Sequence, residues 1–307
     1  MSKKVKSPIK VNSISELNQL LGQPKPLHPL IALHDNKAML LDKSLLPQSF
    51  LFDFYKISYK KALNGKVGYG QGYYDFDEGG MVFTAPNQLL TINDDDMDYE
   101  GMTLLFHTNF IRNYPLGNNI KKFGFFSYAT NEALFLSDKE KQTVFSVFER
   151  IREELNNNID DFSQDVMISY LEVLLNYSNR FYKRQFITRK VVNHDLLTRM
   201  EQSLSDYFDQ EKTLQNGLPT VEYLANELNL SPRYLSDMLR SLTGQNTQQH
   251  IHDKLIEKAK EYLATTNLSV AEIAYQLGFE HSQSLNRLFK KKTDLSPLEF
   301  RQSFNKN

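Results

Sequence analysis

Apolar and polar positions change their period along the chain. Between about residues 28 and 128, apolar and polar residues alternate in short runs such as "FLFDFYKI", and breaks such as "NGKVGYGQG" and "DEGG" separate the runs. Alternation with a period of two predicts β-strands joined by turns. Short, regularly spaced strands are typical of a small sandwich or barrel. The sequence therefore predicts a β-rich N-terminal region.

From Ser137 onward the apolar positions recur at helical spacing. Ser137 and Glu140 stand at the spacing of a capping box, and an apolar stripe follows them. "NNNIDD" breaks this run before a second stripe begins. Two amphipathic helices with a short polar link predict an antiparallel hairpin over 137–183. Packing against the β-region and a dimer interface explain the hairpin equally well, because an apolar stripe does not identify its partner.

The basic stretch "KRQFITRKVVNHD" lacks a regular pattern and gives the predicted linker, residues 184–193. Every apolar pattern after it has a helical period. We therefore expect an N-terminal arm and β domain over 1–136, the helical hairpin over 137–183, and an all-α domain over 194–307. This is a multidomain α+β chain.

The all-α domain contains an internal repeat. One copy, Thr220–Gly244, reads "TVEYLANELNLSPRYLSDMLRSLTG", and the other, Ser269–Asp294, reads "SVAEIAYQLGFEHSQSLNRLFKKKTD" with one extra residue in its turn. Each copy predicts a helix, a turn and a second helix. Asn229 and Gly278 stand where the first helix ends, and both residue types tolerate left-handed backbone. The second helix of each copy buries one stripe and leaves its other face polar.

A third periodic stretch, Thr247–Thr265, separates the two copies. At 1.5 Å per residue, a helix of this length spans about 28 Å. Successive turns of the DNA major groove are roughly 34 Å apart. The polar face of a helix is usually only solvated. For one copy alone, a solvated face is as good an explanation as a face that reads DNA. Two copies on one rod favour a pair of helices that read DNA in adjacent grooves.

From Asn216 onward the chain resembles the AraC/XylS family of transcription regulators. The residues that carry the resemblance are "LA..L..SPRYLS..L", "TG", "IAYQLGFE", "S.SLNRLFKK" and "SPLEFR". The resemblance implies a transcription regulator, not an enzyme, that binds double-stranded DNA through two helix-turn-helix units. For such a regulator we expect the 137–183 helices to form a homodimer. It leaves open two other partners, a small-molecule effector and RNA polymerase.

Residue by residue, the resemblance places DNA contacts on the second helix of each copy. Gln and Asn can pair bidentately with adenine and Arg with guanine, whereas Lys suits the phosphates. Asp237 departs from the family pattern, because a carboxylate repels phosphate unless it accepts from cytosine N4. The expected DNA-binding residues are Arg233, Tyr234 and Ser236 in the first copy and Ser282, Gln283, Ser284, Asn286, Arg287, Lys290 and Lys291 in the second.

Beside that C-terminal region, the β-rich region resembles the cupin-like sensor domain of the same family. "GYYDFDEGGMVFTAPNQ" is similar to a strand–turn–strand portion of a cupin, but it lacks the His-x-His metal ligands. Asp75, Asp77 and Glu78 are explained by a solvated turn more readily than by a hard-cation site. The resemblance implies a cupin-like β-barrel or sandwich whose interior aromatics form its core or line an effector site: Phe52, Phe54, Tyr69, Tyr73 and Phe83.

Composition excludes several other classes of protein. The chain has no cysteine, which excludes disulfides and thiolate chemistry. No apolar run approaches the roughly 20 residues of a membrane span, and the basic N-terminus lacks the apolar core of a secretory signal. We therefore expect a cytoplasmic location and no membrane partner. The net charge of −1 means that an argument for DNA must rest on local charge placement.

The seven histidines are scattered, and on a helix the two of His250-x-His252 point apart. We find no catalytic triad, paired carboxylates or phosphate loop, because "GKVGYGQG" lacks the Lys-Ser/Thr ending of a P-loop. The sequence therefore predicts no metal site and no cofactor. The competing hypothesis is a metal-free cupin enzyme or ligand carrier whose helical tail contacts other proteins.

Overall fold

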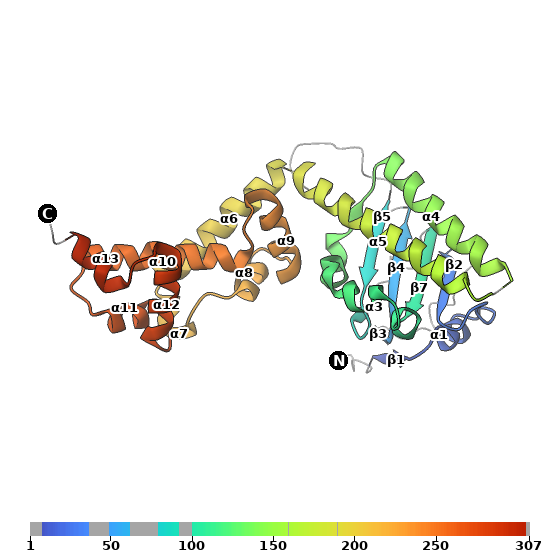
Figure 1. The fold of residues 1–307 in the computed structure, drawn as a ribbon, viewed down its shortest axis with the longest axis horizontal. Helices are drawn as coiled ribbons and strands as arrows, with labels where there is room; N and C mark the ends of the chain where they lie inside the picture. The colour runs from blue at the N-terminus through green and yellow to red at the C-terminus, as the bar shows by residue number, and fades with distance from the viewer. Residues whose placement is uncertain are drawn as a thin grey trace, which may run out of the picture. The chain divides into compact units, whose positions relative to one another are not determined.

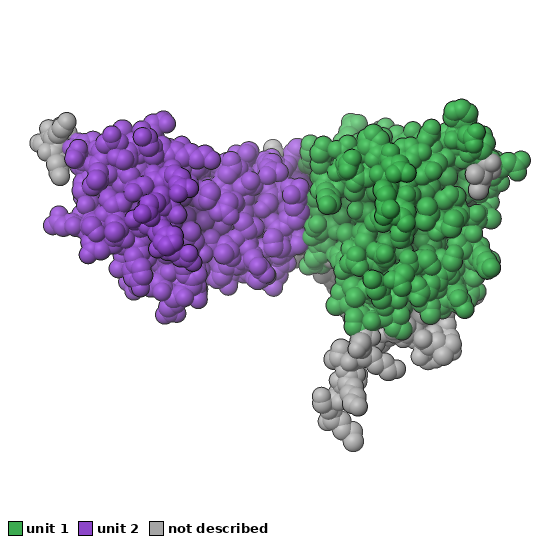
Figure 2. All heavy atoms as spheres, turned by 60° about the horizontal axis from the view of Figure 1, so that its bottom comes forward, with its two compact units in different colours: residues 1–185 green, residues 186–307 purple. Residues whose placement is uncertain are grey.

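The structure is a computed structural model that describes residues 8–36, 49–61, 79–91, 100–158, 160–188 and 190–304. It divides into two compact units, residues 1–185 and 186–307 (Figure 2). All strands of the described residues lie in the first unit, and the described part of the second is helical. A β-rich N-terminal region and an all-α C-terminal region were both predicted, and both are present.

The strands of the first unit form two sheets. The five-stranded sheet is antiparallel, and in the three-stranded sheet β1 and β3 are parallel. The expected strands in "FLFDFYKI" are confirmed. Whether the sheets belong to a closed cupin-like barrel stays a prediction. In sheet order the strands are β2 (Ile31–Asp35), β7 (Gly101–His107), β4 (Phe54–Lys60), β5 (Gly80–Thr84) and β8 (Leu134–Phe135), then β1 (Ile9–Val11), β3 (Ser49–Phe52) and β6 (Leu89–Thr91).

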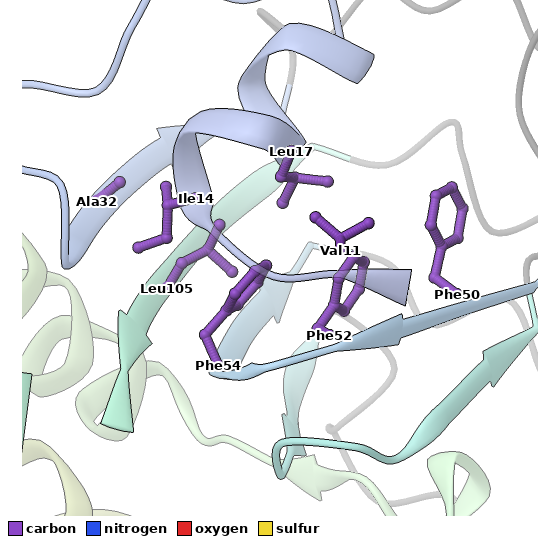
Figure 3. Close-up of a cluster of buried hydrophobic side chains, with 8 residues drawn as sticks. All are labelled: Val11, Ile14, Leu17, Ala32, Phe50, Phe52, Phe54 and Leu105. Carbon is purple, nitrogen blue, oxygen red and sulfur yellow. The ribbon is translucent and has the colours of Figure 1, made fainter. Parts of the chain in front are cut away.

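The two faces of the five-stranded sheet have different neighbours. Ala32 pairs with Leu105 across β2 and β7, so both side chains leave the same face of the sheet. This face joins a hydrophobic cluster with the three-stranded sheet and the helix α1 (Ile14–Leu20), which Figure 3 shows. The cluster comprises Val11, Ile14, Leu17, Ala32, Phe50, Phe52, Phe54 and Leu105.

The opposite face packs against helices (Figure 1). Phe83 on β5 contacts the rings of Phe125, Phe126 and Tyr182, and Tyr59 on β4 contacts Phe145. The helices here are α4 (Asp138–Asn156) and α5 (Ser163–Thr188), together with five short ones between β7 and β8: α2 (Thr108–Ile111), α3 (Pro115–Asn119), η4 (Ile120–Lys122), η5 (Gly124–Ser127) and η6 (Thr130–Glu132). None of the described helices is both long and apolar enough to cross a bilayer.

The predicted linker over 184–193 stays a prediction, but the expected lack of regular structure in this stretch is wrong. Its described residues are helical, because α5 continues to Thr188 and α6 begins at Lys190. Burial extends the helices through this basic stretch: the side chains of Gln185, Phe186 and Asn193 are all at most 3% exposed. Asn193 also donates from Nδ2 to the carbonyl oxygen of Phe186. The domain boundaries that we predict around this stretch stay a prediction.

The second unit surrounds one central helix. The helix α10 (Thr247–Thr265) has the predicted bounds and buries Ile251, Leu255, Ala259 and Leu263. It contacts helices from both copies of the repeat. The remaining helices are α6 (Lys190–Asp209), α7 (Lys212–Asn216), α8 (Val221–Glu227), α9 (Pro232–Thr243), α11 (Val270–Gln276), α12 (Ser282–Thr293) and α13 (Pro297–Phe304).

Candidate nucleic-acid interface

Both copies of the repeat turn between their helices with the same backbone hydrogen bond. Leu230 N–H donates to Ala225 O, and Phe279 N–H donates to Ala274 O, each at 2.9 Å. The residue before each donor is left-handed, with φ of 56° at Asn229 and 87° at Gly278. The predicted left-handed positions are therefore confirmed, and α8–α9 and α11–α12 are both helix-turn-helix units.

The second helices of the two units also match in length and in their ends. Both α9 and α12 have 12 residues, and each stops at a left-handed residue, Gly244 or Asp294. The hydroxyls of Thr243 and Thr293 donate to the carbonyl oxygens four residues earlier. The next helices, α10 and α13, start with the same side-chain exchange, Asn246–Gln249 and Ser296–Glu299. Each copy is therefore a three-helix unit, one helix longer than the sequence repeat indicated.

The polar face of α12 is open to solvent. Leu285 and Phe289 are fully buried on one side of this helix. On the other side Gln283, Ser284, Asn286, Arg287, Lys290 and Lys291 are exposed, and Ser282 is half-buried. Within the described residues, no hydrogen bond or ion pair engages the side chains of Gln283, Asn286 or Arg287. The helix carries four basic residues and no acidic one. It is therefore a positively charged helix whose exposed amide and guanidinium side chains are unpaired within the described part of the chain.

The polar face of α9 is largely occupied by contacts within the protein. Tyr234 is 7% exposed and lies edge-on to Phe186, with ring centroids 5.2 Å apart. Tyr234, one of the expected DNA-binding residues, is therefore buried, because α9 buries two pairs of adjacent residues, Tyr234–Leu235 and Met238–Leu239. Ser236 Oγ lies 3.0 Å from Thr247 Oγ1 at the start of α10.

A carboxylate lies between the two arginines of α9. Arg233 donates from Nε to Asp237 Oδ2 at 3.0 Å, and Arg240 Nη1 is 3.6 Å from Asp237 Oδ1. The Asp237 side chain is 19% exposed, less than either arginine. Of the three residues expected to contact DNA in this copy, only Arg233 is exposed, and it is ion-paired.

The end of α12 is fixed to α10. Lys292 Nζ is 2.5 Å from Asp253 Oδ1, and Gln245 Nε2 donates to the other oxygen of Asp253 at 2.9 Å. Lys292 therefore braces the end of α12 against α10. Burial lowers the pKa of the neighbouring His252, and the charge of Lys292 lowers this pKa further.

The two histidines of His250-x-His252 have different partners. His250 Nε2 is 2.9 Å from Thr243 Oγ1, and His252 Nε2 is 3.0 Å from Gln248 Nε2. Within the described residues, no group of three or more His, Asp or Glu side chains is arranged to hold a metal ion.

The turn of the second helix-turn-helix is supported by α7, which sequence reasoning missed. A Cβ on Gly278 would lie 2.6 Å from the carbonyl carbon of Gly217, so the two backbones touch. Thr213 Oγ1 donates to Gln276 O at 2.7 Å, and Tyr207 donates from its hydroxyl to Gly217 O at 3.1 Å. The sequence signal for this contact is a second glycine, Gly217, whose φ is 71°.

The aromatic residues expected to line an effector site are not brought together. Phe52 and Phe54 belong to the hydrophobic cluster, with ring centroids 5.0 Å apart, and fill the core (Figure 3). Phe83 is on the opposite face of the five-stranded sheet, where it packs against the rings of η5 and α5. Tyr69 and Tyr73 lie outside the described residues, as do Asp75, Asp77, Glu78 and the Gly-rich "GKVGYGQG".

A polar group on the clustered face of the sheet was missed from the sequence. Thr103 donates from its hydroxyl to Asn36 Oδ1 at 2.9 Å, so the 3.1 Å contact between Ser58 and Thr103 has Ser58 as its donor. His34 pairs with Thr103 in the strand register, and burial lowers the pKa of His34. Among the described residues, neither His34 Nε2 nor Asn36 Nδ2 has a hydrogen-bond partner, although both atoms are buried. This polar group could have been predicted from the sequence, because His34, Ser58 and Thr103 are polar residues at strand positions that face the core.

Comparison with known proteins agrees with this geometry. Residues 224–303 match a family described as a helix-turn-helix domain. The chain is 29% identical over 141 residues to the HTH-type transcriptional activator RhaS of Klebsiella pneumoniae. The aligned segment covers 46% of this chain and 46% of that protein. It is 36% identical over 112 residues to the ornithine utilization regulator of Pseudomonas aeruginosa, 36% of this chain and 31% of that protein. The matches thus span less than half of these relatives.

Among solved structures, the C-terminal domain of the response regulator yesN from Fusobacterium nucleatum is 33% identical. The match covers 33% of this chain and 96% of that one, with a TM-score of 0.29. Two helix-turn-helix units around one central helix define the class of the C-terminal unit. Together with the family match and the named relatives, they identify it as a helix-turn-helix domain of the AraC/XylS type.

Proposed function

We propose that this chain is a sequence-specific DNA-binding transcription regulator that reads base edges mainly with α12. The observation that carries this proposal is the unoccupied face of α12, where Gln283, Asn286 and Arg287 stand beside exposed lysines. Amides and guanidinium are the groups that read bases in the major groove, and lysines hold the phosphates. The relative named as a transcriptional activator supports the same function.

Selection from a random duplex pool tests this function. The full chain is immobilised, weakly bound DNA is removed at rising salt, and the retained sequences are read. A regulator enriches a recurrent site, because correct base contacts survive salt that removes phosphate-only binding. The competing enzyme or ligand carrier with a protein-contact tail would retain no duplex even at low salt.

We also propose that the exposed face of α5 joins two copies of this chain. Five large apolar residues lie on or just before this helix and are 36–70% exposed: Phe162, Val166, Val173, Tyr177 and Ile187. Their spacing places them along one side of the helix. Exposed apolar groups of this size often mark protein interfaces.

A lysine placed in this stripe should separate the copies. We expect Val173→Lys to convert a dimer into a monomer, because an unpaired ammonium group would be buried at the interface. Light scattering after size-exclusion chromatography measures the mass. Gln142→Lys on the exposed side of α4 is the matched control. A wild-type monomer at micromolar concentration, or a Val173→Lys dimer, would contradict this role.

A small polar effector is the second partner that we propose, bound at His34, Asn36, Ser58 and Thr103. The unpaired buried atoms His34 Nε2 and Asn36 Nδ2 support it, because unpaired buried polar groups are costly and a ligand would pair them. We expect one member of a panel of monosaccharides and free amino acids to raise the melting temperature of the wild type. Asn36→Ala should abolish that rise, and the exposed-site variant Asn113→Ala should keep it. Equal rises in all three proteins would place the ligand elsewhere.

A further inference from the structure

The two reading helices carry opposite charges at equivalent positions. In the repeat, Leu235 corresponds to Leu285, so Asp237 stands where α12 has Arg287. Arg287 is exposed and unpaired among the described residues. Asp237 instead contacts Arg233 and Arg240 on both sides. The difference in charge between α9 and α12 therefore involves Arg233 and Arg240 as well as Asp237.

Such a cluster changes binding to DNA in two ways. Each cation that neutralises a phosphate releases a condensed counterion, and this release supplies most of the sequence-independent affinity. A carboxylate already beside two guanidiniums offsets part of their charge, and its own charge repels phosphate at short range. Arg233 must also leave its 3.0 Å hydrogen bond before it can contact a phosphate. The first helix therefore meets DNA with little free positive charge.

We propose that Asp237 is a specificity-determining residue that limits phosphate binding by α9. It acts by holding Arg233 and Arg240, so the chain binds arbitrary DNA weakly and depends on the bases read by α12. This role rests on the proposed function in DNA binding. Specificity of this kind comes from lowering affinity for the wrong site, not from raising it for the right one.

Asp237→Asn in the full chain tests this role, because the amide keeps the shape of the carboxylate and removes its charge. Binding to the selected site and to a scrambled duplex is measured by fluorescence anisotropy at several salt concentrations. We expect scrambled DNA to bind about tenfold more tightly at low salt, with a salt dependence steeper by about one phosphate contact. The selected site should gain less, so the ratio of the two affinities falls.

A double-mutant cycle identifies the arginine that is released. Arg233→Ala should change scrambled-DNA binding little in the wild type and remove most of the gain in the Asp237→Asn background. Asp138→Asn, at a 91% exposed side chain in the first unit, makes the same change in net charge and should leave binding unchanged.

Three results would overturn the role. Unchanged binding of Asp237→Asn to scrambled DNA would show that the carboxylate does not limit phosphate binding by α9. Loss of binding only at sites with a particular cytosine would make Asp237 a base reader. Equal gains in Asp237→Asn and Asp138→Asn would reduce the effect to net charge. Absence of DNA binding by the wild type is a different failure, that of the proposed function itself.

Discussion

Gly278→Ala is expected to destabilise the C-terminal unit by about 2–6 kcal/mol, from backbone strain and overpacking together. Gly278 is left-handed at φ 87°, and an added Cβ would meet the carbonyl carbon and oxygen of Gly217 at 2.6 and 2.7 Å. Both contacts are with backbone, so no side chain can move aside. Urea unfolding followed by circular dichroism measures the loss. Domains are stable by only about 5–15 kcal/mol in total, so the loss is a large share.

Gly244→Ala is the matched control for this variant. Gly244 is left-handed at φ 79°, but an added Cβ there meets nothing within 4 Å. It therefore reports the backbone strain alone, about 1–2 kcal/mol. The difference between the two variants measures the contact between Gly278 and Gly217. Equal losses would mean that α7 does not brace the second turn.

Arg287→Ala has the largest effect that we expect on DNA binding. Arg287 is exposed on the open face of α12 with its guanidinium unpaired among the described residues. We expect a loss of about 1–3 kcal/mol at the selected site and relaxed choice at one base pair. Competition with variant duplexes, one base pair changed at a time, identifies that position.

Lys290→Ala separates base reading from charge. Lys290 is exposed one turn further along α12 and suits a phosphate. Its removal should weaken all duplexes alike and reduce the salt dependence by about one contact. The base-reading role of Arg287 would be refuted if both variants weakened selected and scrambled DNA equally. If neither variant changed binding, another face of the domain would have to contact DNA.

Local patterns in the sequence predicted the helices of the C-terminal unit well. The turns at Asn229 and Gly278 and the bounds of α10 depend on residues within one or two helical turns, so short windows of sequence contain them. The open face of α12 could be predicted for the same reason, because only Leu285 and Phe289 are needed to bury the other face.

Contacts between distant segments could not be predicted in the same way. Tyr234 is buried because Phe186 reaches it from a helix much earlier in the chain. The stretch over 184–193 is helical because burial outweighs its basic composition. Phe83 and Phe54 lie on opposite faces of the five-stranded sheet. The strand register determines these faces, and the pattern of aromatic residues alone does not reveal them. The role of every proposed contact with DNA stays a prediction.

The repeat of three-helix units also bears on the order of folding. Each unit closes its contacts within a short stretch of chain, whereas β2 must find β7 across 75 residues, from Ile31 to Phe106. Short loops close with less loss of entropy, and chains rich in local contacts fold faster. We therefore expect the helical unit to reach its native structure before the strands of the sheet have paired. A newly refolded chain would then have an ordered α12 before the strands of its first unit are paired.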